Sequence, residues 1–294
     1  MGMTINTNLM ASNAYLNLNK TQTDMANSMA KLSSGLRINT AADDAAGLSI
    51  SEGLKSQVNG NQIASRNAQD GINVIQTAEG ALTEVHSILQ RVRDLAVQAG
   101  NDSNNTASRA AITQEAKSLS DEVGRIAASS NFNGISLLNG TAGGGTGQLS
   151  FQIGAGATAN DKMSVDLNPS NLTAPSGVVD TLKNLVNDPT GTAPTDGFAS
   201  AAAATTTIST LDTQIASVSA ARSGLGAAQN RLSHAINVLN TNAQNLSAAR
   251  SHITDTDMAQ EMVNYTKDQI LSQAGTAMLA QANQSGQGVL KLLG

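Results

Sequence analysis

Three kinds of residue in this sequence could support chemistry if their spacing allowed it. The tract Gly143–Gly147 is rich enough in glycine to wrap a phosphate, but it lacks the Lys-Ser/Thr pair that completes a phosphate-binding loop. A flexible linker is therefore predicted. The histidines are His86, His234 and His252, and neither H-x-x-x-H nor His-Glu-x-x-His spacing occurs. Because the chain also contains no cysteine, a zinc site is not predicted.

The third kind is a pair of adjacent carboxylates, Asp43 and Asp44. Side chains of neighbouring residues on a helix point in different directions, so the two carboxylates cannot act on one substrate atom. A helix cap or an ion pair with Arg37 is the better interpretation. No catalytic constellation remains, and we predict a protein that is not an enzyme, with no metal and no cofactor.

The composition is that of a structural component rather than of a compact enzyme. Aromatic residues make up 2% of the 294 residues, whereas ligand pockets usually have aromatic walls. The net charge of −5 gives no reason to expect nucleic acid as a partner, and no apolar stretch is long enough to cross a membrane. The N-terminus lacks the basic start and apolar run of a secretory signal peptide, so any export would use a route without a cleavable signal.

A seven-residue repeat of apolar side chains near the C-terminal end is the strongest signal for the elements of the fold. Its members are Leu211, Val218, Leu225, Leu232, Leu239, Leu246 and Ile253. Such a repeat predicts one long helix whose apolar seam packs against another helix.

Two upstream segments carry matching apolar strips with alternating steps of three and four residues. The first strip is Ile75, Ala78, Leu82, Val85, Leu89, Val92 and Ala96, and the second is Ile112, Ala116, Leu119, Val123 and Ile126. The three helices predict a rod-shaped intramolecular bundle. Its core is expected to contain Leu82, Val85, Leu89, Val92 and the seven members of the C-terminal repeat.

Both ends of the chain are helical in pattern and nearly free of charge. Residues 1–36 contain three charged side chains and residues 259–294 contain four. A solvated helix normally has a charged outer face, so these helices are expected to meet neighbours on most sides. The predicted assembly seam consists of Leu18, Met25, Met29, Leu32, Leu36, Val263, Ile270 and Ala277.

Local signals suggest where the elements begin and end. Gly47, Gly53 and Gly60 are expected to break the chain between the N-terminal helix and the rod. A capping-box-like pattern at Ser209–Asp212 predicts the start of the long helix. A second pattern at Thr254–Asp257 predicts a joint before a C-terminal helix.

The middle of the chain differs from both ends. A turn is expected at 101–105, and two alternating apolar runs, Leu149–Ile153 and Met163–Leu167, predict a β-hairpin. Residues 168–207 hold all four prolines and a weak helix candidate, Val178–Val186. They are interpreted as a small surface insert or flexible loop.

The resulting fold class is mainly α: an elongated rod of long coiled-coil-like helices formed by both chain ends, with a small β-hairpin and a short variable insert. The predicted segments are a terminal helix (1–36), a connecting spoke-like segment (37–60), rod helices (61–140), the hairpin (141–167), the insert (168–207), a C-terminal rod helix (208–253) and a second terminal helix (254–294).

Several long motifs resemble those of bacterial flagellins and occur in the same order. They are Ile5–Asn8, Leu32–Gly47, Leu89–Gln98, Asn131–Gly134, Asn245–Ser251, Gln269–Leu271 and Ala280–Gln284. The resemblance covers about residues 3–167 and 208–294. It implies a structural subunit that self-assembles into the flagellar filament for swimming motility, with the terminal helices forming an inner coiled-coil tube and the rod forming the next shell.

The resemblance also implies partners and a location. The subunit is expected to be exported unfolded through the flagellar type III pathway and to reside in the extracellular filament. Its expected partners are further copies of itself, an export chaperone at the C-terminal helix, the filament cap and hook–filament junction proteins. A Toll-like receptor is expected to recognise the monomer at positions that match the family's motif: Gln90, Arg91, Arg93, Leu95 and Glu115.

Other functions remain open at this point. A hook–filament junction adaptor would share both types of terminal helix, although the run Gln90–Arg93 and the C-terminal motif Ala280–Gln284 favour flagellin. A receptor ligand or adhesin would need a substantial outer domain. An embedded protease would need His-Glu-x-x-His, and a cytosolic coiled-coil scaffold would keep charged flanks along its seam.

Overall fold

The structure is a computed structural model that describes residues 8–186 and 197–293, with side chains in the last helix described as far as residue 284. The chain forms two compact units. The terminal unit comprises Met1–Gln57 and Gln244–Gly294, and the rod unit comprises Val58–Ala243. Helices dominate both units, so the prediction of a mainly α fold is confirmed.

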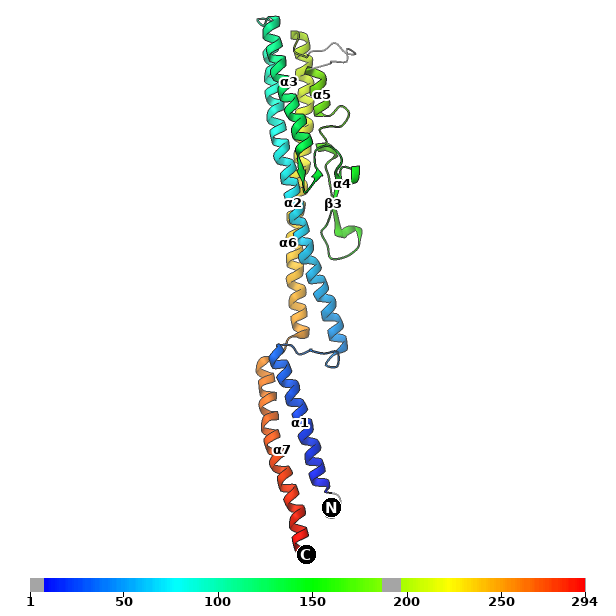
Figure 1. The fold of residues 1–294 in the computed structure, drawn as a ribbon, viewed down its shortest axis with the longest axis vertical. Helices are drawn as coiled ribbons and strands as arrows, with labels where there is room; N and C mark the ends of the chain where they lie inside the picture. The colour runs from blue at the N-terminus through cyan, green and yellow to red at the C-terminus, as the bar shows by residue number, and fades with distance from the viewer. Residues whose placement is uncertain (1–7, 187–196, 294) are drawn as a thin grey trace. The chain divides into compact units, whose positions relative to one another are not determined.

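In the terminal unit, α1 (Leu9–Ser34) and α7 (Met258–Leu293) lie side by side and antiparallel (Figure 1). The Asn8 side chain starts α1 by accepting a hydrogen bond from the Ala11 N–H, and its Nδ2 donates to the Ala282 carbonyl of α7. Asp257 starts α7 in the same way, because its Oδ1 accepts from the N–H groups of Ala259 and Gln260. The predicted joint between the two C-terminal helices is therefore present.

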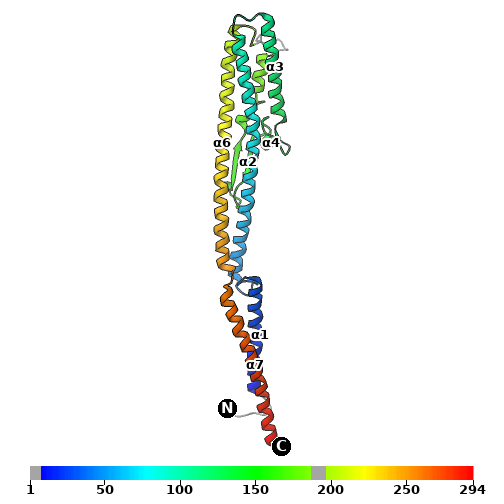
Figure 2. The ribbon, with the colours of Figure 1, turned by 90° about the vertical axis from the view of Figure 1, so that its left-hand side faces the viewer.

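Three long helices build the rod unit: α2 (Ala45–Ala99), α3 (Thr106–Ser129) and α6 (Ala201–Thr254). The first turns of α2 and the last turns of α6 belong to the terminal unit. Figure 2 shows α2 and α6 running alongside each other. The predicted rod-core residues are buried from Leu82 to Val92 on α2 and from Leu211 to Leu239 on α6. The last two members of the repeat, Leu246 and Ile253, are half-buried in the terminal unit.

Two β-hairpins follow α3. The predicted hairpin is present as β3 (Gln148–Gln152) paired antiparallel with β4 (Lys162–Asp166). A smaller hairpin, β1 (Asn131–Phe132) and β2 (Ile135–Ser136), was not predicted. Its turn is Asn133-Gly134, with φ of 50° and 80°, which matches the strong preference of tight hairpin turns for Asn-Gly. Two 3₁₀ helices, Ala159–Asp161 and Asn168–Ser170, flank β4.

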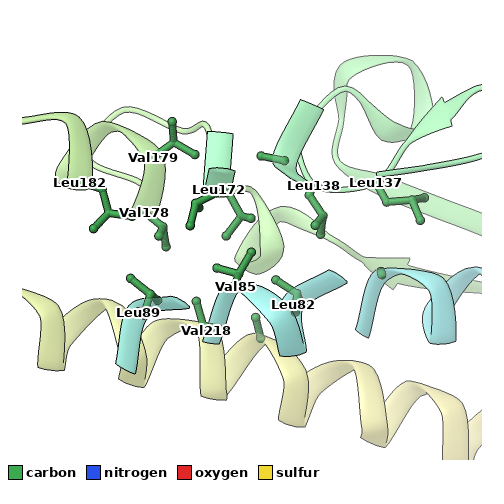
Figure 3. Close-up of a cluster of buried hydrophobic side chains, with 14 of the residues drawn as sticks. Leu82, Val85, Leu89, Leu137, Leu138, Leu172, Val178, Val179, Leu182 and Val218 are labelled. Atoms are coloured by element: carbon green, nitrogen blue, oxygen red, sulfur yellow. The ribbon is translucent and has the colours of Figure 1, made fainter. Parts of the chain in front are cut away.

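Residues 168–186 and 197–207 contribute several apolar side chains to the hydrophobic core, which corrects the interpretation of 168–207 as a surface insert. The helix α5 (Val178–Val186) has the predicted bounds, and Phe198 is fully buried. Figure 3 shows Val178 and Leu182 of α5 directed toward Val85 and Leu89 of α2. An amphipathic helix with one strongly apolar face is stable only when that face is covered, which explains the packing. Residues 187–196 lie outside the described part.

Several predicted boundaries are wrong. The helix α2 runs unbroken through Gly47, Gly53 and Gly60. At Gly47 and Gly60 the absence of a side chain allows other residues to lie close to the helix. A Cβ on Gly47 would lie 2.4 Å from Asp44 Oδ2, and one on Gly60 would lie 2.6 Å from the Ala155 Cβ. A glycine inside a helix costs only about 1 kcal/mol relative to alanine, so tertiary packing overrides it.

The long helix also begins earlier than the Ser209–Asp212 pattern indicates. Ser200 caps α6 by accepting a hydrogen bond from the Ala203 N–H, and Asp212 is engaged elsewhere. The glycine tract is a defined left-handed turn within α4 (Ala142–Gly145) rather than a flexible linker. Gly143 has φ of 62°, and a Cβ there would collide with the Gln148 carbonyl oxygen.

Candidate functional site

The most buried residues on the face that α7 turns toward α1 are polar or small. They include Glu261, Asp268 and Ala282, and Gly275 lies where a Cβ would be 3.3 Å from Leu18 Cδ1. From α1, Leu18 and Ser28 are buried in the contact. Two helices can approach closely at such small residues, but little apolar surface is removed from water. The pair therefore holds together with a modest hydrophobic contribution.

Large apolar side chains are exposed on both terminal helices, outside the contact between them. On α1 the exposed large hydrophobic residues are Leu9, Met10, Tyr15, Leu16 and Met29, and on α7 they are Met258, Met262, Val263, Ile270, Leu271 and Met278. We call these eleven side chains the outward face. Soluble monomeric proteins rarely expose apolar residues in such numbers together, and larger patches of this kind mark interaction sites.

The predicted assembly seam is divided between the two faces. Leu18 is buried against α7, and Met25, Leu32 and Leu36 are half-buried, whereas Met29 is exposed. Val263 and Ile270 are 62% and 61% exposed, and Ala277 is exposed as well. Residues two positions apart on a helix differ by about 200° in direction. Val263 and Ile270 therefore point away from α1, while Glu261 and Asp268 point toward it. These α7 residues do not form a seam with α1 of the same chain.

A small backbone clip closes the terminal unit where α1 ends and α6 gives way to α7. Leu36 and Asp255 form an isolated β-bridge, in which the Arg37 N–H donates to the Thr254 carbonyl at 2.6 Å and the Thr256 N–H donates to the Gly35 carbonyl at 3.1 Å. Arg37 Nη2 donates to the Ile253 carbonyl at 2.7 Å, at the C-terminal end of α6. Helix C-termini favour cations, so this placement is electrostatically favourable.

The two adjacent carboxylates cap local backbone groups, and Asp44 also faces Arg37, in agreement with the predicted cap or ion-pair role. Asp44 lies 3.9 Å from Arg37 Nη2, and its Oδ1 accepts from the Gly47 N–H at the start of α2. Asp43 accepts hydrogen bonds from the backbone N–H groups of Thr40 and Asn39 and from the Thr40 hydroxyl. These bonds favour the ionised form and lower the pKa of the Asp43 carboxyl. Both carboxylates are helix-terminal and structural, and neither is paired for catalysis.

Ion pairs join the three helices of the rod unit at the residues predicted to meet a receptor. Arg91 on α2 donates from Nε and Nη2 to Glu115 Oε1 on α3, at 2.9 Å and 2.7 Å. Arg93 on α2 donates from Nε to Asp212 Oδ1 on α6 at 2.6 Å. The hydrogen bond from Arg93 lowers the pKa of Asp212, and the same contact raises that of Arg93. All four side chains are at least one-third exposed and accessible.

The remaining two residues of the receptor set differ from each other. Gln90 is exposed, with its amide 3.4 Å from the His86 ring. Leu95 is only 1% exposed and belongs to the hydrophobic core, so it is not accessible to a partner in this conformation. The sequence position matched a motif, but the helix phase turns Leu95 inward with Val92 and Ala99.

Within residues 8–186 and 197–293, no group of three or more His, Asp or Glu side chains is arranged to hold a metal ion. No helix in the same ranges is long and apolar enough to cross a membrane. The features that stand out are therefore two surfaces, the outward face and the ion-paired face of the rod unit, together with the clip.

Comparisons with known proteins identify the family of the chain. A model of the bacterial flagellin N-terminal helical region matches residues 5–143, and one of the C-terminal helical region matches residues 208–293. The chain belongs to the bacterial flagellin family. It is 45% identical to a flagellin of Halalkalibacterium halodurans over 291 residues, which cover 99% of this chain and 100% of that protein. It is 41% identical to a flagellar filament 33 kDa core protein of Treponema phagedenis over 297 residues, again 99% and 100% of the two chains.

A solved structure of a putative flagellar hook-associated protein from Vibrio parahaemolyticus is similar to 72% of this chain and to 100% of its own, with a TM-score of 0.57 and 17% identity. At that identity the likeness concerns the fold alone. The family membership rests on the two matched regions, which include helices of both units, and on relatives that align over nearly the whole chain.

Sequence reasoning missed three features of these surfaces. The clip is made by backbone groups, which leave no side-chain pattern, although Arg37 and Asp44 were paired correctly. The ion pair of Arg93 with Asp212 was missed because Asp212 also fits a cap pattern. The exposure of Met262 and Leu271 was also missed, because a single sequence does not show which flanks of α7 the partner helix leaves uncovered.

Proposed function

We propose that this chain is the structural subunit of a bacterial flagellar filament and that it polymerises through the outward face of α1 and α7. The filament is extracellular, and its role is swimming motility. Contacts between copies arranged head to tail, which do not close into a ring, generate a helical filament. Such an assembly buries surface that one copy leaves in water.

The observation that carries the proposal is the distribution of apolar residues on the terminal helices. α7 buries Glu261 and Asp268 against its own partner helix and leaves Val263 and Ile270 in water. Apolar burial is worth about 25 cal/mol per Å², so covering the outward face with neighbouring copies supplies the driving force that the isolated pair lacks. The names of the relatives, which include a flagellar filament core protein, agree with this assignment.

The family supports further proposals about the life of the subunit. We infer export in an unfolded state through the flagellar type III pathway, with a chaperone that covers the C-terminal helix before export. Two long, separate helices with weak mutual packing suit such handling, because isolated helices with little tertiary contact are easily unfolded. The cap protein at the tip and the hook–filament junction proteins at the other end are the expected neighbours of the last and first copies.

Seeded polymerisation tests the main proposal. Purified subunits are mixed with short sheared filaments, sedimented, and imaged by negative-stain electron microscopy. Elongated filaments are the expected result. Folded subunits that stay monomeric or form short rings would reject the filament role and favour the junction adaptor, whose fold is related.

Receptor recognition of the free monomer is a separate proposal. The exposed part of the site consists of Gln90, Arg91, Arg93 and Glu115. Arg91→Ala is expected to reduce Toll-like-receptor signalling in reporter cells without unfolding the monomer. Arg125→Ala is the matched control, since Arg125 is also an exposed, ion-paired arginine and lies outside the motif. Equal signalling by both variants would reject the assignment.

A further inference from the structure

The methionines of this protein are concentrated on its terminal helices. Of nine methionines, Met1 and Met3 lie outside the described residues, and six of the other seven lie on α1 and α7. Five of these six are 47–68% exposed, namely Met10, Met29, Met258, Met262 and Met278. The sixth, Met25, is half-buried in the contact with α7. The seventh, Met163 of β4, is 5% exposed in the rod-unit core.

Thioethers are the only side-chain sulfur in the molecule, because the chain has no cysteine. A peroxide therefore has no thiol to consume before it reaches methionine. The sulfur donates an electron pair to one oxygen of hydrogen peroxide, the O–O bond breaks, and an S–O bond forms. The second oxygen leaves as water after proton transfer. Sulfur is oxidised by two electrons, peroxide is reduced, and sulfoxide reductases can reverse the change.

We propose that the five exposed methionines are a reversible oxidation site that controls assembly: peroxide converts them to sulfoxides on the free subunit, and the oxidised subunit no longer joins a filament. The inference rests on the proposed function, because it concerns the same outward face. It adds a chemical signal, a peroxide of the surroundings, to which that face responds.

The physical reason is the change in polarity at the buried contact. A thioether is a flexible apolar group that adapts to irregular surfaces. A sulfoxide carries a strong hydrogen-bond acceptor, and burying it without a donor is unfavourable. The exposed apolar residues in the same stretch of α7, Val263, Ile270, Leu271 and Ala277, offer no side-chain donor to a sulfoxide on Met262 or Met278. The oxidised face would therefore prefer water to a second copy.

Exposure also predicts the order of reaction. The five exposed methionines should oxidise first in the free subunit, Met25 more slowly, and Met163 last, since its sulfur is shielded by the rod-unit core. In finished filaments the five exposed sites become covered, so their oxidation should slow toward that of Met163. Met163 is thus an internal reference within the same chain.

The test uses the full-length wild-type subunit. It is treated with hydrogen peroxide until each exposed methionine is about half oxidised, quenched, and mixed with untreated sheared filaments. Sulfoxide at each methionine is then measured by peptide mass spectrometry in the pelleted filaments and in the supernatant. Because oxidised and unoxidised copies compete in one tube, no substitution is needed, and circular dichroism of the oxidised supernatant checks that its subunits remain folded.

The expected result is depletion of sulfoxide in the pellet by at least about fivefold at one or more of the five positions, as burial of an unpaired polar group predicts. Treatment of the supernatant with sulfoxide reductases should restore its elongation. Equal sulfoxide in pellet and supernatant at all five positions would overturn the inference. Failure of untreated subunits to elongate seeds would overturn the proposed function, and this inference with it.

A variant tests whether peroxide acts through these five methionines. Leucine has nearly the volume of methionine, so M10L/M29L/M258L/M262L/M278L conserves packing while removing every exposed sulfur. This variant is expected to elongate seeds equally well before and after peroxide. If it assembles but loses that ability after peroxide, oxidation acts elsewhere and the assignment to these five residues is wrong.

Discussion

The rod unit and the terminal unit differ in where they place their large apolar side chains. The rod unit buries its apolar side chains against its own helices, so that Leu82, Leu89 and Leu232 are fully inaccessible to water. In the terminal unit, α7 buries Glu261 and Asp268 and exposes Val263 and Ile270. The rod unit is therefore complete in one subunit, whereas the terminal unit leaves apolar side chains exposed that the proposed assembly would cover.

The largest effect is expected from placing charge on the outward face. V263D/I270D is expected to abolish seeded polymerisation, because burying two unpaired carboxylates costs several kcal/mol or more. The rod unit should keep its thermal transition in circular dichroism. The matched control Q76D/T83D adds the same two charges, seven residues apart, on exposed positions of α2. Filament growth by V263D/I270D would show that the outward face is not the assembly surface.

Truncating one large side chain in each unit should change the free energy of unfolding by very different amounts. Leu89→Ala should lower the free energy of unfolding by about 2–5 kcal/mol, because it leaves a cavity in a close-packed core. Ile270→Ala should change subunit stability by less than about 0.5 kcal/mol, since the side chain is in water. Denaturant unfolding of both variants gives the two values. Similar losses would mean that the terminal unit is already packed in the free subunit.

A smaller effect is expected at the clip. Arg37→Gln keeps a donor for the α6 carbonyl but removes the charge that faces Asp44 and the helix C-terminus. We expect amide hydrogen exchange at Thr256 to accelerate by about threefold to tenfold, in line with about 1 kcal/mol for a helix-terminal charge interaction. Exchange in the middle of α3, in the rod unit, serves as the reference. An unchanged rate at Thr256 would show that the backbone bridge is sufficient without the charge.

The smallest effect is a pH dependence in the rod unit. The folded-state pKa of Asp212 is lowered by Arg93, so the unfolded chain binds more protons below the ordinary aspartate value of about 3.9. The stabilisation is therefore present above that pH and is lost as the pH falls through the folded-state pKa. Thermal melts at pH 6 and pH 3 should differ less for Asp212→Asn than for the wild type. Identical differences would assign the acid sensitivity to other carboxylates.

The same contrast between units explains what the sequence could reveal. The rod helices were predictable because their apolar strips are covered within the chain, so pattern and burial coincide at Leu82, Val85 and Leu211. The terminal helices show an equally clear repeat at Val263 and Ile270, but a repeat indicates only that a face will be covered. It does not tell which molecule covers it, and here the partner within the chain takes the polar face.

The errors at individual sites have local physical causes. Gly47 and Gly60 resemble helix breaks in sequence, yet each is required by a close approach that only a folded structure contains. Leu95 fits a receptor motif by position, but the phase of α2 turns it into the core. The clip between Leu36 and Asp255 is formed by backbone groups, which are the same in every residue and so carry no signature.

The separation of α1 and α7 along the chain has a consequence for the order of folding. The Asn8 side chain bonds to a carbonyl 274 residues away, and Arg37 bonds to one 216 residues away. Contacts between such distant residues close large loops and form slowly, whereas the contacts of α2 with α3 are local. A chain delivered N-terminus first therefore holds α1 without its partner until the last residues arrive. We therefore expect the terminal unit to form after the local contacts of the rod unit.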